Sequence, residues 1–62
     1  MYKLVDEVAQ EILQFKTKKA CEAEAKYRVN NYKKGFVFKR NYIEAMNVKL
    51  IQTEEEIRIC LD

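Results

Sequence analysis

Proline and glycine, the two residues that most often mark chain reversals, are almost missing: among 62 residues there is no proline and one glycine, Gly35. Their near absence leaves few positions at which the chain must turn. The glycine closes the segment Asn30–Gly35, and asparagine also tolerates left-handed backbone conformations. We therefore expect one long element before residue 30, a reversal in this segment and shorter elements after it.

Apolar residues in the first half recur at the spacing of an amphipathic helix. Val5, Val8, Ile12 and Phe15 follow one another at intervals of three and four residues, which places them on one helical face. Acidic residues near the start of this stretch and basic residues near its end also suit the helix dipole. The pattern predicts one long helix over about residues 2–28.

The last third of the chain supports two interpretations. Five apolar residues share one face of a helical wheel: Ile43, Met46, Leu50, Ile57 and Leu61. Asn41 and Thr53 are each followed three residues later by glutamate, the spacing of a capping box. Apolar residues alternate over 48–50 and 57–61, which indicates a β-hairpin instead. Glutamates at the connection make a poor tight turn, so helix is favoured.

The expected fold class is therefore mainly α, in a single small domain of residues 1–62. A long N-terminal helix at about residues 2–28 would have one or two shorter helices packed back on it. The alternative is an α+β fold with a C-terminal β-hairpin. A core of this size supplies only about 3–5 kcal/mol of stability. Because a helical hairpin leaves an apolar side open, we expect a homodimer.

Membrane and metal sites are not expected. Acidic residues interrupt the N-terminal stretch, and no apolar run approaches the roughly 18 residues that a spanning helix requires. We therefore expect a cytoplasmic protein whose thiols, Cys21 and Cys60, are free. With two cysteines and no histidine, one chain cannot supply the four ligands of a structural zinc site. No cofactor is expected.

The composition also argues against an enzyme. The sequence has no histidine and no serine, so neither a Ser-His-Asp triad nor a Cys-His pair can be built from it. A lone glycine excludes a phosphate-binding glycine-rich loop. The leading hypothesis is a small regulatory or adaptor protein that binds a protein partner of unknown identity.

The candidate protein-binding surface is a second apolar strip on the reverse side of the predicted helix, formed by Cys21, Ala25 and Val29. If the helix is continuous, this strip faces away from the main core. A substitution such as Ala25→Glu would then abolish binding without changing thermal stability. The alternative is that three small residues at this spacing have no role.

The net charge of +2 conceals a basic middle between acidic ends. Residues 16–40 have nine basic and two acidic side chains, against a net −2 for residues 1–15 and −3 for residues 41–62. Interleaved with aromatic residues such as Tyr27 and Tyr32, such a segment is typical of nucleic-acid binding. The alternative function is therefore nucleic-acid binding by Lys26, Arg28, Lys33, Lys34, Lys39 and Arg40. The simpler interpretation is that these cations only keep a helix end and a loop soluble.

Overall fold

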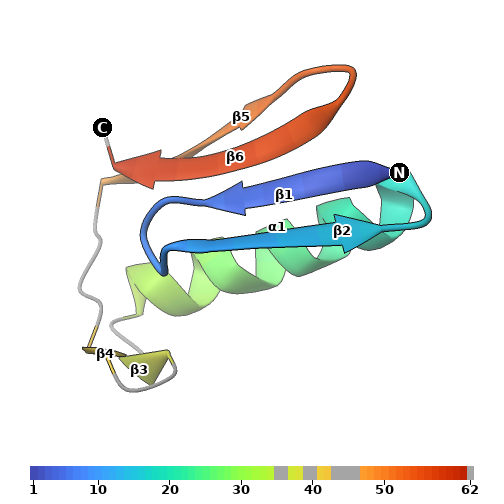
Figure 1. The fold of residues 1–62 in the computed structure, drawn as a ribbon. Helices are drawn as coiled ribbons and strands as arrows, with labels where there is room; N and C mark the ends of the chain where they lie inside the picture. Colours follow the sequence, from blue (N-terminus) through green and yellow to red (C-terminus); the bar gives the residue numbers. More distant parts are fainter. Residues whose placement is uncertain (35–36, 39–40, 43–46, 62) are drawn as a thin grey trace.

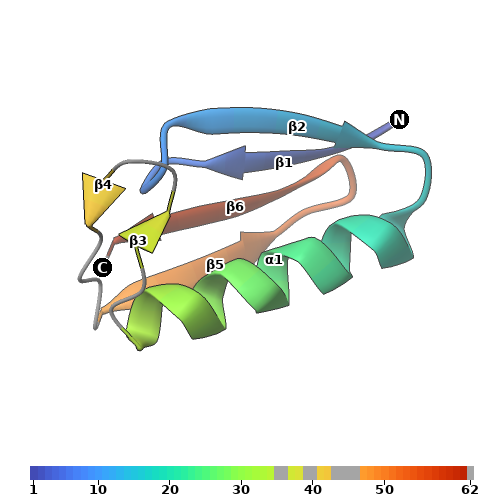
Figure 2. The same cartoon turned by 90° about the horizontal axis from the view of Figure 1, so that it is seen from below.

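Within the described residues, the chain forms a mixed β-sheet with a helix across one face (Figures 1 and 2). The computed structural model describes residues 1–34, 37–38, 41–42 and 47–61. The sheet has the strand order β2-β1-β6-β5, in which the central pair β1 and β6 is parallel and the other pairs are antiparallel. Its strands are β1 (Tyr2–Asp6), β2 (Glu11–Phe15), β5 (Val48–Gln52) and β6 (Glu56–Leu61). The helix is α1 (Lys18–Lys33), and a separate short ladder joins β3 (Val37–Phe38) to β4 (Asn41–Tyr42).

The prediction of a mainly α fold, with a helix over about residues 2–28, is wrong. Residues 2–15 form a β-hairpin in which Val5 lies opposite Ile12, on the sheet face away from α1. A spacing of seven residues is nearly two helical turns, but a tight hairpin also brings two residues seven apart side by side. The periodicity therefore fits both structures, and the hairpin is the one that forms.

The turn of this hairpin uses neither glycine nor proline. The Asp6 carboxylate accepts a hydrogen bond from the backbone N–H of Ala9 at 2.9 Å, so a side chain closes the turn. Gln10 then adopts a left-handed conformation with φ of 58°. These residues supply the reversal that the composition did not indicate.

A second β-hairpin, β5 and β6, occupies residues 48–61, as in the alternative α+β interpretation. Thr53 explains why this segment also has a helix signal. Its Oγ1 accepts hydrogen bonds from the backbone N–H groups of Glu55 at 3.3 Å and Glu56 at 3.2 Å. A helix N-cap bonds the third residue on in the same manner, but here the threonine closes the turn between two strands. Asn41, the other predicted helix start, lies instead in strand β4 (Asn41–Tyr42), and residues 43–46 after it are outside the described residues.

The core lies between α1 and the sheet. The central strands contribute the fully buried Leu4, Ile57 and Ile59, and the helix contributes Cys21, Ala25 and Tyr32. Tyr2 closes one end, where its hydroxyl donates to the backbone carbonyl of Thr53 at 2.5 Å. This packing fixes which face of α1 is turned toward the sheet and which remains exposed.

Candidate nucleic-acid interface

Helix α1 begins at a threonine N-cap. Thr17 has an extended backbone with φ of −129° and ψ of 151°, and its Oγ1 accepts from the backbone N–H of Ala20 at 3.1 Å. Lys33, in the last turn, is favourably placed at the negative end of the helix dipole. Because residues 2–15 are strands and α1 packs on the sheet that they help to form, its buried and exposed faces differ from those of the helix predicted from the sequence.

Three exposed lysines follow one another along the outer face of α1. Lys19, Lys26 and Lys33 are seven residues apart, so successive lysines lie about 10.5 Å apart along the axis and drift by only about 20° around it. None of the three forms an ion pair with a described residue. We call this set the lysine ridge.

The two carboxylates of α1 are bonded to groups other than the ridge lysines, and Glu24, two residues before Lys26, lies on the opposite side of the helix from the ridge. Glu24 accepts from Nε of Arg28 at 2.7 Å. Glu22 accepts from the side-chain amide of Gln52, on β5, at 2.9 Å. Further lysines extend the positive charge at both ends of the helix, with exposed side chains at Lys16, Lys18 and Lys34. The outer face of α1 is therefore a basic surface of the fold.

Arg28, a predicted nucleic-acid-binding residue, is buried instead. Its Nη1 donates to Asp6 at 2.7 Å and to Glu11 at 2.8 Å, while its Nε donates to Glu24. Burial alone would lower the pKa of Arg28, but these hydrogen bonds to carboxylates outweigh it and raise the pKa above its usual value. The Arg28 side chain faces the sheet, so its charge stabilises the contact between α1 and the β1–β2 hairpin and is not exposed to a ligand.

The aromatic residues of the basic segment also separate into two groups. Tyr32 is fully buried and donates a short hydrogen bond from its hydroxyl to Asp6. Burial, followed by the neighbouring Asp6 carboxylate, raises the pKa of Tyr32 above its usual value. Tyr27 has 59% of its surface exposed and stands next to Lys26 on the helix. Of these two tyrosines, Tyr27 is the one a base could stack on.

The predicted protein-binding strip is the core face of α1, so its interpretation as a docking surface is wrong. Cys21 and Ala25 are fully buried, and the partly buried Val29 packs against the same core. Burial also raises the pKa of the Cys21 thiol. The strip points inward because the sheet, and not a second helix, covers this side of α1.

The remaining predicted residues fall in different places. Lys26, Lys33 and Lys34 are exposed on α1 or at its C-cap. Lys39 and Arg40 lie outside the described residues. The structure thus brings Lys26 and Lys33 together in one ridge with Lys19, which the sequence analysis did not select. Its signal was the seven-residue spacing, but the helix predicted from the sequence ended near residue 28 and left Lys33 out, whereas α1 extends to Lys33.

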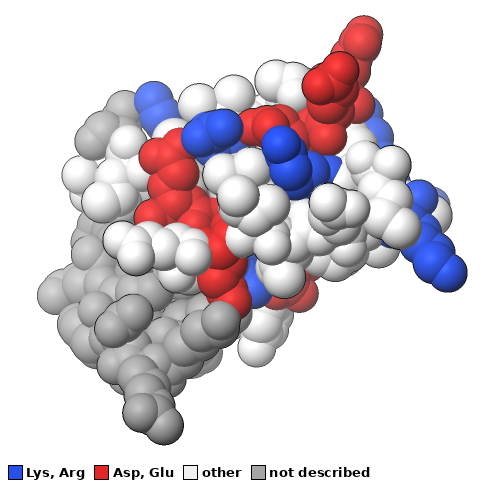
Figure 3. All heavy atoms as spheres, viewed as in Figure 1, with Lys and Arg blue, Asp and Glu red and all other residues white. Residues whose placement is uncertain are grey.

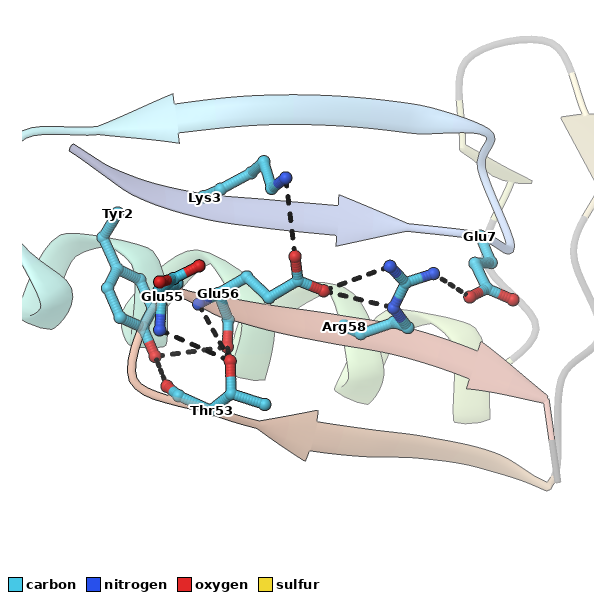
Figure 4. Close-up of polar contacts among 7 residues, drawn as sticks. All are labelled: Tyr2, Lys3, Glu7, Thr53, Glu55, Glu56 and Arg58. Carbon is cyan, nitrogen blue, oxygen red and sulfur yellow. Dashed lines mark hydrogen bonds and ion pairs between the residues drawn. The ribbon is translucent and has the colours of Figure 1, made fainter.

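The opposite face of the sheet has a different charge pattern, because its charges pair with one another (Figure 4). Arg58 donates to Glu7 at 2.5 Å and lies 3.1 Å from Glu56, which in turn is 3.5 Å from Nζ of Lys3. Figure 3 shows acidic and basic atoms adjoining on this side of the molecule. An anion that approaches this face therefore meets carboxylates beside both Arg58 and Lys3. At the lysine ridge, by contrast, the cations form no ion pairs with described residues.

Comparison with known proteins gives no relative: no family model, no curated protein and no solved structure matches this chain. Among the described residues, no three His, Cys, Asp or Glu side chains are grouped so that they could hold a metal ion. In the same part of the chain, no helix has the length and apolar character needed to cross a bilayer.

Proposed function

We propose that this chain is a non-enzymatic protein that binds the phosphate backbone of nucleic acid through the lysine ridge of α1. The observation that supports this proposal is the regular row of Lys19, Lys26 and Lys33 on an exposed helix face, without an ion pair to any described residue. The absence of histidine and serine from the sequence is the reason for proposing binding and not catalysis.

The length of the ridge suits a polyanion better than a single phosphate. Its outer lysines are 14 positions apart, which corresponds to about 21 Å along the helix axis. Duplex DNA has one charge per roughly 1.7 Å of its axis, so a row of this length meets several phosphates. Lysine is a flexible point charge, and contacts to phosphates carry no sequence information directly, so we expect little preference for sequence.

Tyr27 suggests which form of nucleic acid is favoured. Its exposed ring lies about 100° around the helix from Lys26, within reach of a strand that crosses the ridge, and aromatic rings stack on unpaired bases of any sequence. In a duplex the base faces are already stacked on one another and are closed to this contact. We therefore propose that single strands bind at least as tightly as duplexes of equal length, and that Tyr27→Ala weakens only single-strand binding.

The direct test compares two double variants that lose the same charge from opposite faces. Lys26→Gln with Lys33→Gln removes two cations from the ridge, and Lys3→Gln with Lys49→Gln removes two from the sheet face opposite α1. Titration into labelled oligonucleotides at low salt should show affinity falling about tenfold for the ridge variant and much less for the control. Equal losses would mean that net charge, and not the ridge, governs binding.

Protein binding by a regulatory or adaptor protein, the leading hypothesis from the sequence, stays a second proposal. The strip that supported it lies in the core, so the proposal needs another surface. Among the described residues, the feature that favours such a surface is the outer edge of β2, and the partner that suits it is a second copy of the chain.

A further inference from the structure

The hydrogen bonds of β1 establish which backbone groups of β2 face outward. The N–H of Lys3 donates to the carbonyl of Glu55 at 3.3 Å, and the N–H of Glu7 to that of Ile59 at 2.8 Å. The odd-numbered residues of β1 thus bond to β6. Because backbone groups alternate along a strand, the even-numbered residues, Tyr2, Leu4 and Asp6, direct theirs toward β2.

The register then identifies the unpaired positions. The partners of Tyr2, Leu4 and Asp6 on β2 are Phe15, Leu13 and Glu11. Ile12 and Gln14 lie between these residues, so their N–H and C=O groups point away from β1. No described strand pairs with this side of β2, which is the outermost strand of the sheet (Figures 1 and 2).

This edge lacks the features that usually prevent pairing. Exposed edges are commonly protected by lysine, proline or a bulge, and the strand Glu11–Phe15 contains no lysine, proline or glycine. The Ile12 side chain is 67% exposed, although it is among the most apolar in the chain. Leu13 and Phe15 are only partly buried on the helix-facing side. The strand therefore offers both backbone groups and apolar surface to a partner.

We propose that two copies of this chain associate by antiparallel pairing of their β2 strands, centred on Leu13. Ile12 would exchange backbone hydrogen bonds with Gln14 of the partner subunit, and Leu13 would pack on Leu13 of the partner subunit. Charge favours this direction: β2 begins at Glu11 and is followed by Lys16 and Lys18. Antiparallel pairing places the acidic end of each strand beside the basic end of the other.

The dimer is a continuous sheet with α1 and its partner on the same face. Side chains keep their faces across a new strand pair, so a two-fold axis perpendicular to the sheet relates the copies. The two lysine ridges then lie on one side of the assembly. This inference does not rest on the proposed nucleic-acid binding, because the β2 edge and the ridge share no residue.

The test uses two variants that reverse each other's effect. Ile12→Lys with Gln14→Lys places like charges opposite one another across the proposed interface, and Ile12→Glu with Gln14→Glu does the same with the opposite sign. Both positions are exposed, so each variant should keep the circular dichroism spectrum and the unfolding midpoint of the wild type within a few degrees. Sedimentation velocity from micromolar to millimolar concentration gives the mass of each species.

We expect the wild type to form dimers in this range, each variant alone to remain monomeric, and an equal mixture of the two variants to dimerise again. The Lys49→Gln variant, altered on the other edge strand, should dimerise as the wild type does. A wild type that stays monomeric at millimolar concentration would overturn the proposal. Dimers that persist in both charged variants would also overturn it, since another surface would then be responsible.

Discussion

Arg28 of α1 donates from Nη1 to Oδ2 of Asp6 of β1 at 2.7 Å, and both side chains are almost fully buried. The same carboxylate closes the β1–β2 turn through the N–H of Ala9 and accepts from the hydroxyl of Tyr32. One buried carboxylate therefore ties the helix, the first strand and the first turn together. Because buried charges are costly unless fully paired, this network determines how α1 sits on the sheet.

Removing the charge of Asp6 should destabilise the fold strongly. Asp6→Asn keeps the shape of the side chain but leaves Arg28 without one of its buried carboxylates, so we expect a loss of about 3 kcal/mol in the free energy of unfolding. Urea unfolding measures this loss. The control is Glu7→Gln, which breaks the exposed ion pair with Arg58 and should cost less than about 1 kcal/mol. Similar costs for the two variants would contradict the assigned role of Asp6.

The two tyrosines of α1 offer a matched comparison. Tyr32→Phe removes a buried hydrogen bond to a carboxylate and should cost about 1.5–3 kcal/mol at neutral pH. Tyr27→Phe changes an exposed side chain and should cost less than about 0.5 kcal/mol. Thermal and urea unfolding of both variants test this, and a stable Tyr32→Phe would argue against the buried network.

Alkaline pH should destabilise the wild type through the same tyrosine. Burial and Asp6 raise the pKa of Tyr32 above its ordinary value of 10.0, so the folded state holds this proton more tightly than the unfolded state. The stability that the raised pKa of Tyr32 contributes is complete below pH 10. It is lost as the pH rises above 10, by up to about 1.4 kcal/mol per pH unit. Urea unfolding in this range should therefore show a shallower decline for Tyr32→Phe than for the wild type. An equal loss of stability with pH in the two proteins would contradict the raised pKa of Tyr32.

The two alanines on opposite faces of α1 test the position of the core. Ala25→Glu places a charge in the fully buried interior and should unfold the protein or cost more than about 3 kcal/mol. Ala23→Glu lies on the exposed face and should keep the melting temperature close to that of the wild type. The second variant also places a carboxylate between Lys19 and Lys26, so it should weaken oligonucleotide binding while leaving the fold intact.

The protein should be more stable with glycine than with glutamine at position 10, the left-handed position of the β1–β2 turn. Gln10 has φ of 58°, a conformation that costs a residue with a Cβ roughly 1–2 kcal/mol. Glycine avoids this cost but loses more entropy on folding, so Gln10→Gly should raise the free energy of unfolding by about 0.5–1 kcal/mol. Chemical unfolding of this variant tests the turn geometry, and a clear loss of stability would contradict it.

The sequence predicted part of the candidate surface but not the fold class. Lys26 and Lys33 were selected from charge alone, and both are exposed on α1. The hairpin of residues 2–15 was missed because its turn depends on the Asp6 side chain and on Gln10, residues that rarely signal a reversal. Its paired Val5 and Ile12 also repeat at a spacing close to two helical turns.

The misassigned helix start also changed the meaning of the residues after it. With a helix from about residue 2, Cys21 and Ala25 lie on the reverse side from Val5 and Ile12, and they were interpreted as a surface strip. In the structure the helix starts after its N-cap Thr17, and the face of α1 that holds these two residues packs on the sheet, so both are buried in the core. The burial of Arg28 was not predictable from its own neighbourhood, because Asp6 and Glu11 are 22 and 17 residues away along the chain.

The most direct test of the proposed function is the salt dependence of binding. The affinity for an oligonucleotide should be measured from low to moderate salt for the wild type and for the triple variant Lys19→Gln, Lys26→Gln and Lys33→Gln. If the ridge contacts phosphates, the slope of log K against log salt becomes shallower by about 0.9 for each of these lysines that contacts duplex DNA. An unchanged slope and affinity in a folded triple variant would show that the ridge does not bind nucleic acid.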